Sequence, residues 1–240
     1  MSITGYNALV ILNIYKKRGR TSYSIVSEVK RKLVIKKVGH AGTLDPLAEG
    51  VLIILTDKDT KKQKEFLNKE KTYITDIGFG IYTDTYDLEF IPEVVITSED
   101  NWNNLRKKLS SSSLSDILIN FVGNIKQKAP IYSALSIKGQ RLYKLARKGI
   151  KASEINLPER DITIYDIQLL KSYNKDIKTD KGVKIVPCIQ ISVRCSSGTY
   201  IRSLIGDIAQ KIGTEAVSLS IIRTSIGEYN ISNSLDIDSI

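Results

Sequence analysis

The chain contains few of the residues that form disulfides, bind metals or span membranes. Its 240 residues include two cysteines and one histidine. Two cysteines do not make a disulfide framework, and no paired Cys/His spacing suggests a metal site, so a reducing, cytoplasmic environment is expected. The longest apolar runs, Ala8–Leu12 and Val51–Leu55, are far shorter than the ~20 residues of a membrane span. Because the N-terminus also lacks the pattern of a secretion signal, we expect no membrane partner.

Several familiar catalytic motifs are also missing. The sequence has no Gly-x-x-x-x-Gly-Lys-Ser/Thr phosphate loop, no complete Gly-x-Gly-x-x-Gly and no His-Glu-x-x-His. Because His40 is the single histidine, a histidine-based triad could be built only around that residue. A catalytic site in this chain is therefore expected to rely on a carboxylate.

Positive charge, by contrast, is abundant and concentrated near the N-terminus. The chain is 42% hydrophobic and 26% charged, which is typical of a globular protein, and its formal net charge is +10. Residues 1–44 hold nine Lys and Arg against one acid, Glu28. This concentration favours a polyanionic partner. A solvated basic surface without a partner is the alternative reading of the charge alone.

Hydrophobic periodicity predicts interspersed strands and helices. Strands are expected at Ala8–Ile14, Val51–Leu55, Lys71–Phe79, Arg160–Leu170 and Lys184–Cys195. Helices are expected after Thr21 or Ser22, at Thr60–Asn68, from Ser98 to Leu109, at Leu114–Phe121 and at Ile201–Ile212. Without strict βαβ alternation, this order predicts an α+β fold with a mixed, mostly antiparallel central sheet flanked by helices. We expect one domain over residues 1–240, since no linker or repeat divides the chain.

The segment Gly39–Leu52 is the most unusual in the sequence. Gly39–Pro46 has neither helical nor strand period and is expected to be a loop. Asp45 precedes Pro46, which disfavours helical backbone, and the glycines at 42 and 50 permit sharp turns or close approach. A carboxylate held in this way is able to attack an electrophilic carbon. The alternative is that Asp45 caps a turn, as Asp-Pro pairs commonly do.

Two further residues have chemistry that such a site would use. Arg202 follows Gly198–Ile201 at the start of a helix, where a guanidinium is able to pair with a carboxylate and keep it ionised. Tyr73 lies early in an alternating strand and could present a flat ring to a nucleic-acid base. Taken separately, a solvated arginine and a core tyrosine are the alternatives.

Together these segments resemble the TruB-type tRNA pseudouridine synthases. Gly39–Leu52 is similar to the catalytic loop of that family, Lys71–Tyr73 to its tyrosine-bearing strand and Ser197–Leu204 to its arginine motif. Further similar blocks are Gly123–Gln127, Pro130–Ala134, Gly139–Tyr143 and Ala146–Gly149, in a substrate-side insertion at about 90–155, and Ile222–Thr224 in a late strand. One departure is Lys17, which stands where the family usually has proline.

The resemblance implies a role for each of these residues. Asp45 would be the nucleophile, attacking either the uracil ring or the ribose C1′ of a flipped-out uridine. Arg202 would hold Asp45 ionised, Tyr73 would stack on the target base, and His40 would contact the RNA where the nucleotide leaves its stack. The remaining substrate contacts implied by the motifs are Lys71, Tyr200 and Ile222.

The resemblance also implies a substrate and a set of partners. The family substrate is uridine 55 in the T-arm of tRNA, and the reaction uses neither a metal nor an organic cofactor. We expect a monomer without a separate C-terminal RNA-binding domain, since the similar blocks end near Tyr229. The alternative function is a non-catalytic RNA-binding or RNA-folding module on the same architecture.

Overall fold

The computed structural model describes residues 11–137 and 139–240, so the start of the predicted strand Ala8–Ile14 lies outside the described residues. The chain divides into two compact units. The first unit combines the residues up to Ile74 with Ile221–Ile240, and the second comprises Thr75–Ser220. The expectations of one catalytic domain and of an insertion at about 90–155 stay predictions.

The first unit is built around the strand β3. Its elements are β1 (Ile11–Lys16), α1 (Ser22–Lys32), β2 (Val38–Ala41), β3 (Glu49–Thr56), a 3-10 helix (Asp57–Lys62), α2 (Gln63–Asn68), the start of β4 (Lys71–Phe79), the end of β12 (Ala216–Ile226), β13 (Tyr229–Asn230) and β14 (Leu235–Asp236), with short 3-10 turns at Ile231–Asn233 and Ile237–Ser239. Strand β3 pairs antiparallel with β1 and β2 and parallel with β12. Strand β14 pairs parallel with β1.

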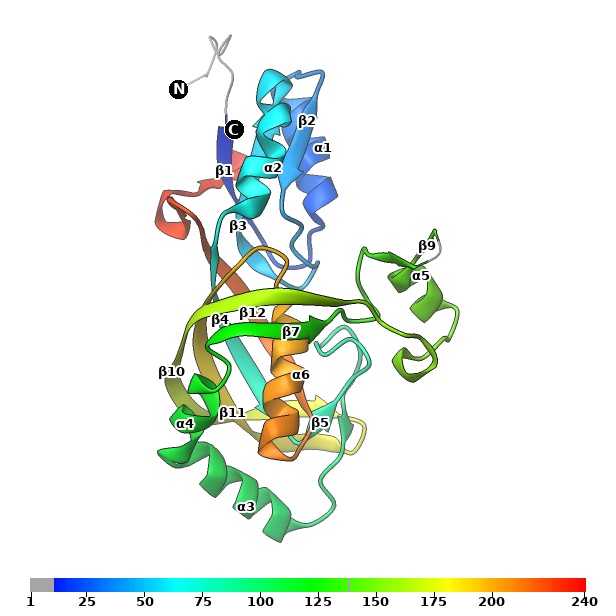
Figure 1. Cartoon of the computed structure of the whole chain (residues 1–240), viewed down its shortest axis with the longest axis vertical. Helices are drawn as coiled ribbons and strands as arrows, with labels where there is room; N and C mark the ends of the chain where they lie inside the picture. Colours follow the sequence, from blue (N-terminus) through cyan, green and yellow to red (C-terminus); the bar gives the residue numbers. More distant parts are fainter. Residues whose placement is uncertain (1–10, 138) are drawn as a thin grey trace. The chain divides into compact units, whose positions relative to one another are not determined.

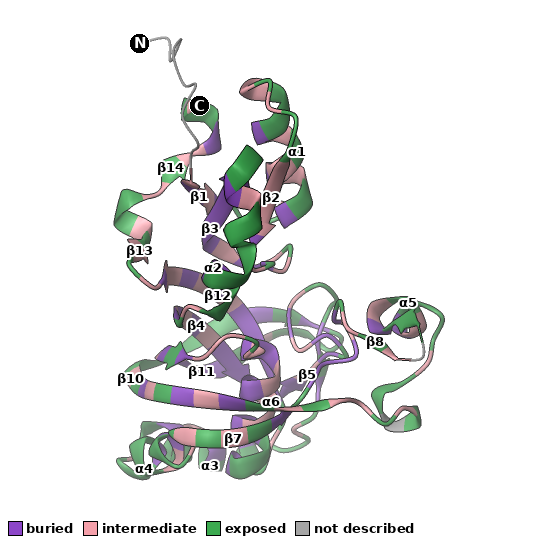
Figure 2. Ribbon diagram, turned by 45° about the horizontal axis from the view of Figure 1, so that its top comes forward, coloured by how far each residue is buried: buried purple, intermediate pink, exposed green. Residues whose placement is uncertain are grey.

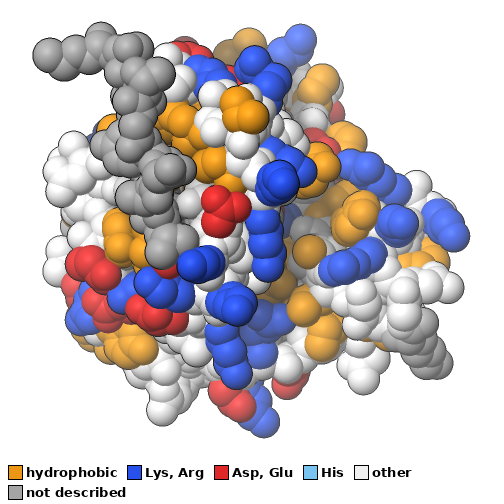
Figure 3. Space-filling view, turned by 90° about the horizontal axis from the view of Figure 1, so that it is seen from above, with side chains coloured by type: hydrophobic (Ala, Val, Ile, Leu, Met, Phe, Trp, Pro, Cys, Tyr) orange, Lys and Arg blue, Asp and Glu red, His pale blue; other side chains and the backbone are white. Residues whose placement is uncertain are grey.

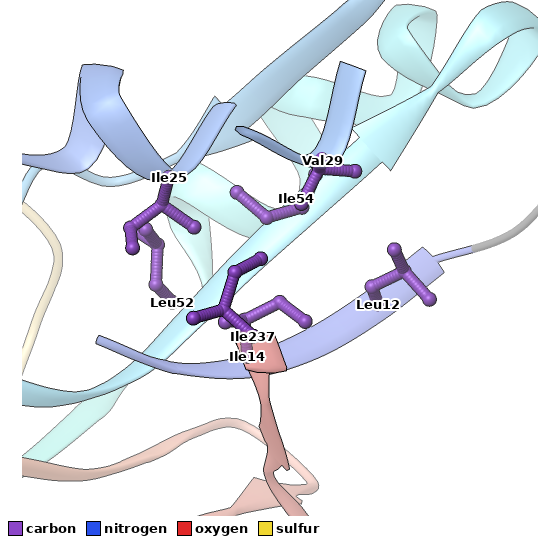
Figure 4. Packing of buried hydrophobic residues seen from close by; sticks show 7 residues of the cluster. All are labelled: Leu12, Ile14, Ile25, Val29, Leu52, Ile54 and Ile237. Atoms are coloured by element: carbon purple, nitrogen blue, oxygen red, sulfur yellow. The ribbon is translucent and has the colours of Figure 1, made fainter. Parts of the chain in front are cut away.

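Strand β3 is buried on both faces, which explains its unbroken apolar run. Figure 2 shows it as buried along most of its length. One face packs under α1 in a cluster that Figure 4 draws: Leu12, Ile14, Ile25, Val29, Leu52, Ile54 and Ile237. The other face contributes to a second cluster: Ala41, Val51, Ile53, Leu55, Phe66 and Ile226. Packing on both faces holds in place the strand that follows the Asp45 loop.

The second unit is dominated by a long hairpin, visible in Figure 1 as β10 and β11. Its elements are the rest of β4, β5 (Ile81–Tyr82), β6 (Glu93–Val94), α3 (Glu99–Ser110), α4 (Ser113–Ile119), β7 (Gly123–Lys128), β8 (Ser136–Ile137), β9 (Gln140–Arg141), α5 (Leu142–Arg147), a 3-10 turn (Ala152–Glu154), β10 (Glu159–Thr179), β11 (Gly182–Cys195), α6 (Ile201–Ile212) and the start of β12. Strand β10 pairs antiparallel with both β11 and β7. Helix α3 packs against β11, and α4 packs against β10.

The helix boundaries follow from local chemistry. The side chains of Thr21 and Ser98 accept the backbone N–H groups of Ser24 and Asn101, which confirms both as N-caps. Helix α6 buries its predicted apolar face and ends at Gly213, whose φ of 88° is left-handed. The predicted helix at Thr60–Asn68 is a 3-10 helix that continues as α2.

The predicted fold class is confirmed: both units carry helices against a mixed, mostly antiparallel sheet. Two local expectations were wrong. The segment Gly39–Pro46 is not all loop, because β2 covers its first residues and pairs with β3. Strand β10 extends to Thr179, well beyond the predicted Leu170, because β11 pairs with it along this polar stretch. No helix in the described part of the chain has the length and apolarity needed to cross a bilayer.

Candidate active site

Asp45 lies in a short, tightly held loop between β2 and β3. Its carbonyl oxygen accepts the N–H of Ala48 at 3.1 Å, which closes a turn over Pro46. The preceding residue, Leu44, is buried, and its N–H donates to the Ser22 hydroxyl at 2.9 Å. The Asp45 residue itself is half-buried. The loop therefore presents one carboxylate from a backbone that is anchored immediately before and after it.

Lys16 anchors the second half of this loop from β1. It is fully buried, and its ammonium donates to the carbonyl oxygens of Ala48 and Arg20, both at 2.6 Å, and of Pro46 at 3.3 Å. Burial lowers the pKa of Lys16 to about 8, whereas the negative charge of Asp45 acts to raise it. Lys16 is therefore a cation at neutral pH, held beside the candidate nucleophile.

Arg223 anchors the other half of the loop from β12. Its guanidinium is buried and donates to the carbonyl oxygens of Val51 at 2.8 Å and Gly42 at 3.0 Å. A buried cation is tolerated only when its donors are satisfied, and here main-chain carbonyls satisfy them. Ile222, its predicted neighbour at the site, is half-buried and pairs with Glu49 at the start of β3.

His40 lies in β2, opposite Ile54 of β3. Its backbone carbonyl accepts the side-chain amide of Gln63 at 2.8 Å. The imidazole Nδ1 is buried and has no hydrogen-bond partner among residues 11–137 and 139–240. Burial, and to a lesser degree the positive charge of Arg223, lower the pKa of His40 below its usual 6.5. The side chain is therefore a neutral hydrogen-bonding group at physiological pH.

Lys71 and Tyr73 lie at the start of β4, and both are buried. The Lys71 ammonium donates to the carbonyl oxygens of Leu67 at 2.6 Å and Phe66 at 3.5 Å, in the last turn of α2. In the structure Lys71 thus caps the C-terminal end of a helix. Tyr73 is 8% exposed. The substrate contacts expected of these two residues stay predictions.

Arg202 lies in the first turn of α6 and is 4% exposed. Its Nη1 donates to the carbonyl oxygen of Thr85 at 2.8 Å, and its Nη2 donates to that of Tyr132 at 2.9 Å. Its Nε lies 4.0 Å from Oδ2 of Asp87, another buried residue. The predicted arginine is therefore a fixed, oriented cation, and its pairing with Asp45 stays a prediction.

Tyr200 is the N-cap residue of α6, and a buried glutamine holds its backbone. Gln127 of β7 accepts the N–H of Tyr200 at 2.8 Å and donates to its carbonyl oxygen at 3.1 Å. The Arg160 guanidinium lies 5.0 Å from the Tyr200 ring centroid. These contacts fix where α6 begins and thereby fix the position of Arg202.

The predicted residues thus fall into two groups. The first unit holds His40 on β2, Asp45 in the loop into β3, Lys71 and Tyr73 at the start of β4, and Ile222 on β12; the second holds Tyr200 and Arg202 at the start of α6. Sequence reasoning missed three buried charged residues that hold these groups: Lys16, Asp87 and Arg223. Lys16 lies at the end and Arg223 within a strand of mostly apolar residues, and only the structure shows that both are buried.

The N-terminal cations give the first unit a set of exposed positive side chains, here called its basic surface, and Figure 3 shows Lys and Arg side chains at several places on the face seen from above. The exposed members are Lys17, Arg18, Lys30, Arg31, Lys36 and Lys37. Lys17 pairs with Asp236 at 2.8 Å and Asp238 at 3.1 Å. The C-terminal acids therefore neutralise part of the basic surface.

Comparison with known proteins assigns this architecture to the pseudouridylate synthases, a class of RNA-modifying isomerases. The family described as "TruB family pseudouridylate synthase (N terminal domain)" matches residues 30–201. The chain belongs to this family of enzymes.

The curated relatives agree with this assignment, and a solved structure shares the fold. The tRNA pseudouridine synthase B of Fusobacterium nucleatum subsp. nucleatum is 43% identical over 223 residues, which are 92% of this chain and 69% of the relative. That of Clostridium tetani is 39% identical over 96% of this chain and 72% of its own length. A Cbf5-Nop10-Gar1 complex shares the fold, with a TM-score of 0.64 at 23% identity over 95% of this chain, which spans 53% of that neighbour.

Proposed function

We propose that this protein converts uridine 55 to pseudouridine in the T-arm of tRNA, with Asp45 as the nucleophile on a flipped-out uridine. The observation that carries the proposal is the Asp45 loop, in which a half-buried carboxylate is presented between two buried cations that bind its backbone. The relatives named tRNA pseudouridine synthase B, at about 40% identity over most of the chain, support the substrate.

The reaction is an isomerisation: it requires an attacking group, and it involves no net oxidation or reduction. Attack by Asp45 on either the ribose C1′ or the uracil ring leads to cleavage of the N1–C1′ bond. The freed base then turns, and its C5 bonds to C1′ as Asp45 is released. The C5 proton is lost and N1 regains one, so the atoms balance without a metal or an organic cofactor.

Each predicted residue has a defined part in this proposal. Arg202, oriented by Thr85, Tyr132 and Asp87, keeps the Asp45 carboxylate ionised and therefore nucleophilic. Tyr73 stacks on the target base, and neutral His40 contacts the RNA where the nucleotide leaves its stack. Tyr200, Ile222 and Lys71 complete the substrate contacts. We further propose that the protein acts as a monomer in the cytoplasm.

The basic surface of the first unit supplies the attraction for a folded RNA. Lys30, Arg31, Lys36 and Lys37 are exposed at the end of α1 and in the turn that follows. Lysine and arginine at such a surface bind phosphates without reading sequence, and the affinity falls as salt rises. In the proposal this surface concentrates tRNA, while the residues around Asp45 select the nucleotide.

The test is to incubate the protein with an unmodified tRNA transcript and map pseudouridine at single-nucleotide resolution. Native protein is expected to give product at position 55 only, Asp45→Asn none, and the surface control Asp116→Asn the native amount. A transcript with cytidine at position 55 should give no product. If native protein and Asp45→Asn bind tRNA equally and neither forms pseudouridine, the non-catalytic RNA-binding module replaces the enzyme.

A further inference from the structure

Arg223 is the largest of the fully buried side chains in the described part of the chain, at 1% exposure. A guanidinium is always charged, and moving a charge out of water costs several kcal/mol unless hydrogen bonds compensate. A position inside an 11-residue strand of mostly apolar residues would ordinarily hold isoleucine or valine. The groups that Arg223 contacts therefore indicate what its charge does.

The side-chain hydrogen bonds that Arg223 makes within the described part of the chain all go to the backbone around Asp45. Its Nε donates to the carbonyl oxygen of Val51 at 2.8 Å, after the loop. Its Nη2 donates to that of Gly42 at 3.0 Å, and its Nη1 to that of Thr43 at 3.5 Å, before the loop. One planar group thus ties together the two ends of the segment that carries Asp45.

The backbone around Arg223 is shaped to allow this reach. Arg223 lies opposite Gly50 where β12 and β3 run parallel. Gly50 has a φ of +105°, and a Cβ there would overlap the carbonyl oxygen of Arg223 and lie 2.9 Å from its nitrogen. The close approach at Gly50 is what places the guanidinium under the loop, within reach of Gly42 and Thr43.

We propose that Arg223 is a positioning residue for Asp45, fixing the direction of the carboxylate by holding both ends of its loop. This inference rests on the proposed function. In this assignment Arg223 acts through three main-chain carbonyls and not on the substrate itself. The three nitrogens of the rigid, planar Arg223 guanidinium each donate to one of those carbonyls, whereas a lysine ammonium donates from a single nitrogen. A positive charge alone is therefore insufficient to hold the loop, which requires the planar guanidinium.

The experiment compares Arg223→Lys, which keeps the charge, and Arg223→Met, which keeps the bulk, with the control Arg106→Lys, at a half-buried arginine of α3 that pairs with Glu99 at 2.8 Å. For each folded variant we measure the affinity for unmodified tRNA and the single-turnover rate of pseudouridine formation at saturating enzyme. A misplaced reacting group commonly costs about 100-fold in rate, so both Arg223 variants should lose about that factor. Their tRNA affinity should stay near the native value, and Arg106→Lys should match the native protein in both measurements.

Each other outcome has a defined meaning. A folded Arg223→Lys or Arg223→Met at the native rate overturns the positioning role, and so does a parallel loss of affinity and rate. If neither variant folds, Arg223 serves the fold as a whole and the assignment is overturned as well. Native protein and the Asp45→Asn variant are run beside them: absence of product from native protein contradicts the proposed function itself, which separates the two failures.

Discussion

Asp87 and Arg202 lie against each other inside the second unit, with Oδ2 of the aspartate 4.0 Å from Nε of the arginine. Both residues are buried, and Oδ1 of Asp87 accepts the Thr85 hydroxyl at 2.7 Å and the N–H of Glu89 at 3.0 Å. These two hydrogen bonds fix the Asp87 carboxylate independently of its contact with the Arg202 guanidinium. It compensates the charge of Arg202 and restricts the directions in which that side chain can point.

Replacing Asp87 by asparagine is therefore expected to slow the reaction without abolishing tRNA binding. The neutral amide leaves Arg202 less constrained, and we expect the single-turnover rate to fall about 10-fold or more. Single-turnover assays on a tRNA transcript, combined with filter binding, measure both quantities. The matched control is Asp84→Asn, an exposed aspartate of the same segment that accepts the Tyr82 hydroxyl at 2.6 Å. A native rate for Asp87→Asn would contradict the role given to this pair.

The second prediction concerns the pKa of His40, which NMR can measure without overlap because the chain has a single histidine. Burial, followed by the charge of Arg223, lowers the pKa of His40, so its Cε1–H resonance should titrate below 6.5. In Arg223→Met the pKa should rise, yet stay below 6.5, because burial is the larger cause. Since an unfolded histidine binds its proton at higher pH than His40 does, the free energy of unfolding should fall as the pH drops below about 6.5. A native His40 that titrates at or above 6.5 would refute this.

Gly50 provides a test of how closely β3 and β12 approach. Alanine at this position combines a left-handed φ of +105° with overlap of the Arg223 backbone. We expect Gly50→Ala to lower the free energy of unfolding by about 3 kcal/mol in urea denaturation. At Gly39, in β2, an added Cβ would meet no described atom within 4 Å, and the backbone φ is not positive. Gly39→Ala should therefore change stability by no more than about 0.5 kcal/mol. Equal stability of the two variants would show that the strands separate without cost.

The sequence predicted those elements whose structure depends on interactions between residues close together in the chain. The caps at Thr21 and Ser98, the apolar face of α6 and its end at Gly213 depend on neighbours within a few positions. Such local patterns are readable because period, capping and left-handed glycine follow from short-range sterics and hydrogen bonding. The mixed, mostly antiparallel sheet followed from the order of these elements.

What the sequence did not predict depends on residues far apart in the chain. His40 belongs to β2 because β3 supplies its hydrogen bonds, although glycine and histidine have little strand propensity. Lys16 and Arg223 were missed as loop anchors because their partners are main-chain carbonyls, which no side-chain motif records. Asp87 was missed for a similar reason, since its partner Arg202 lies more than a hundred residues later. Three of the groups that orient the candidate site were therefore accessible only from the structure.

Tyr73 provides the sharpest test of how the target base is held. If its flat ring stacks on the uracil, Tyr73→Phe should keep activity, whereas Tyr73→Leu should lose most of it. Stacking of a base on an aromatic ring contributes about 1–3 kcal/mol, so the rate with Tyr73→Leu should fall about 10-fold or more. The rates of both variants are measured as single-turnover pseudouridine formation at saturating tRNA.

Because Tyr73 is 8% exposed, the leucine variant also changes packing, and this effect must be separated from stacking. Tyr229 is the matched control, since it packs against Phe66 in the same unit with ring centroids 5.7 Å apart. Tyr229→Leu removes a comparable ring and should lower the melting temperature with little change in rate. If Tyr73→Phe and Tyr73→Leu react equally fast, the ring of Tyr73 does not hold the base. If Tyr229→Leu slows the reaction as much as Tyr73→Leu does, the loss reflects packing rather than stacking.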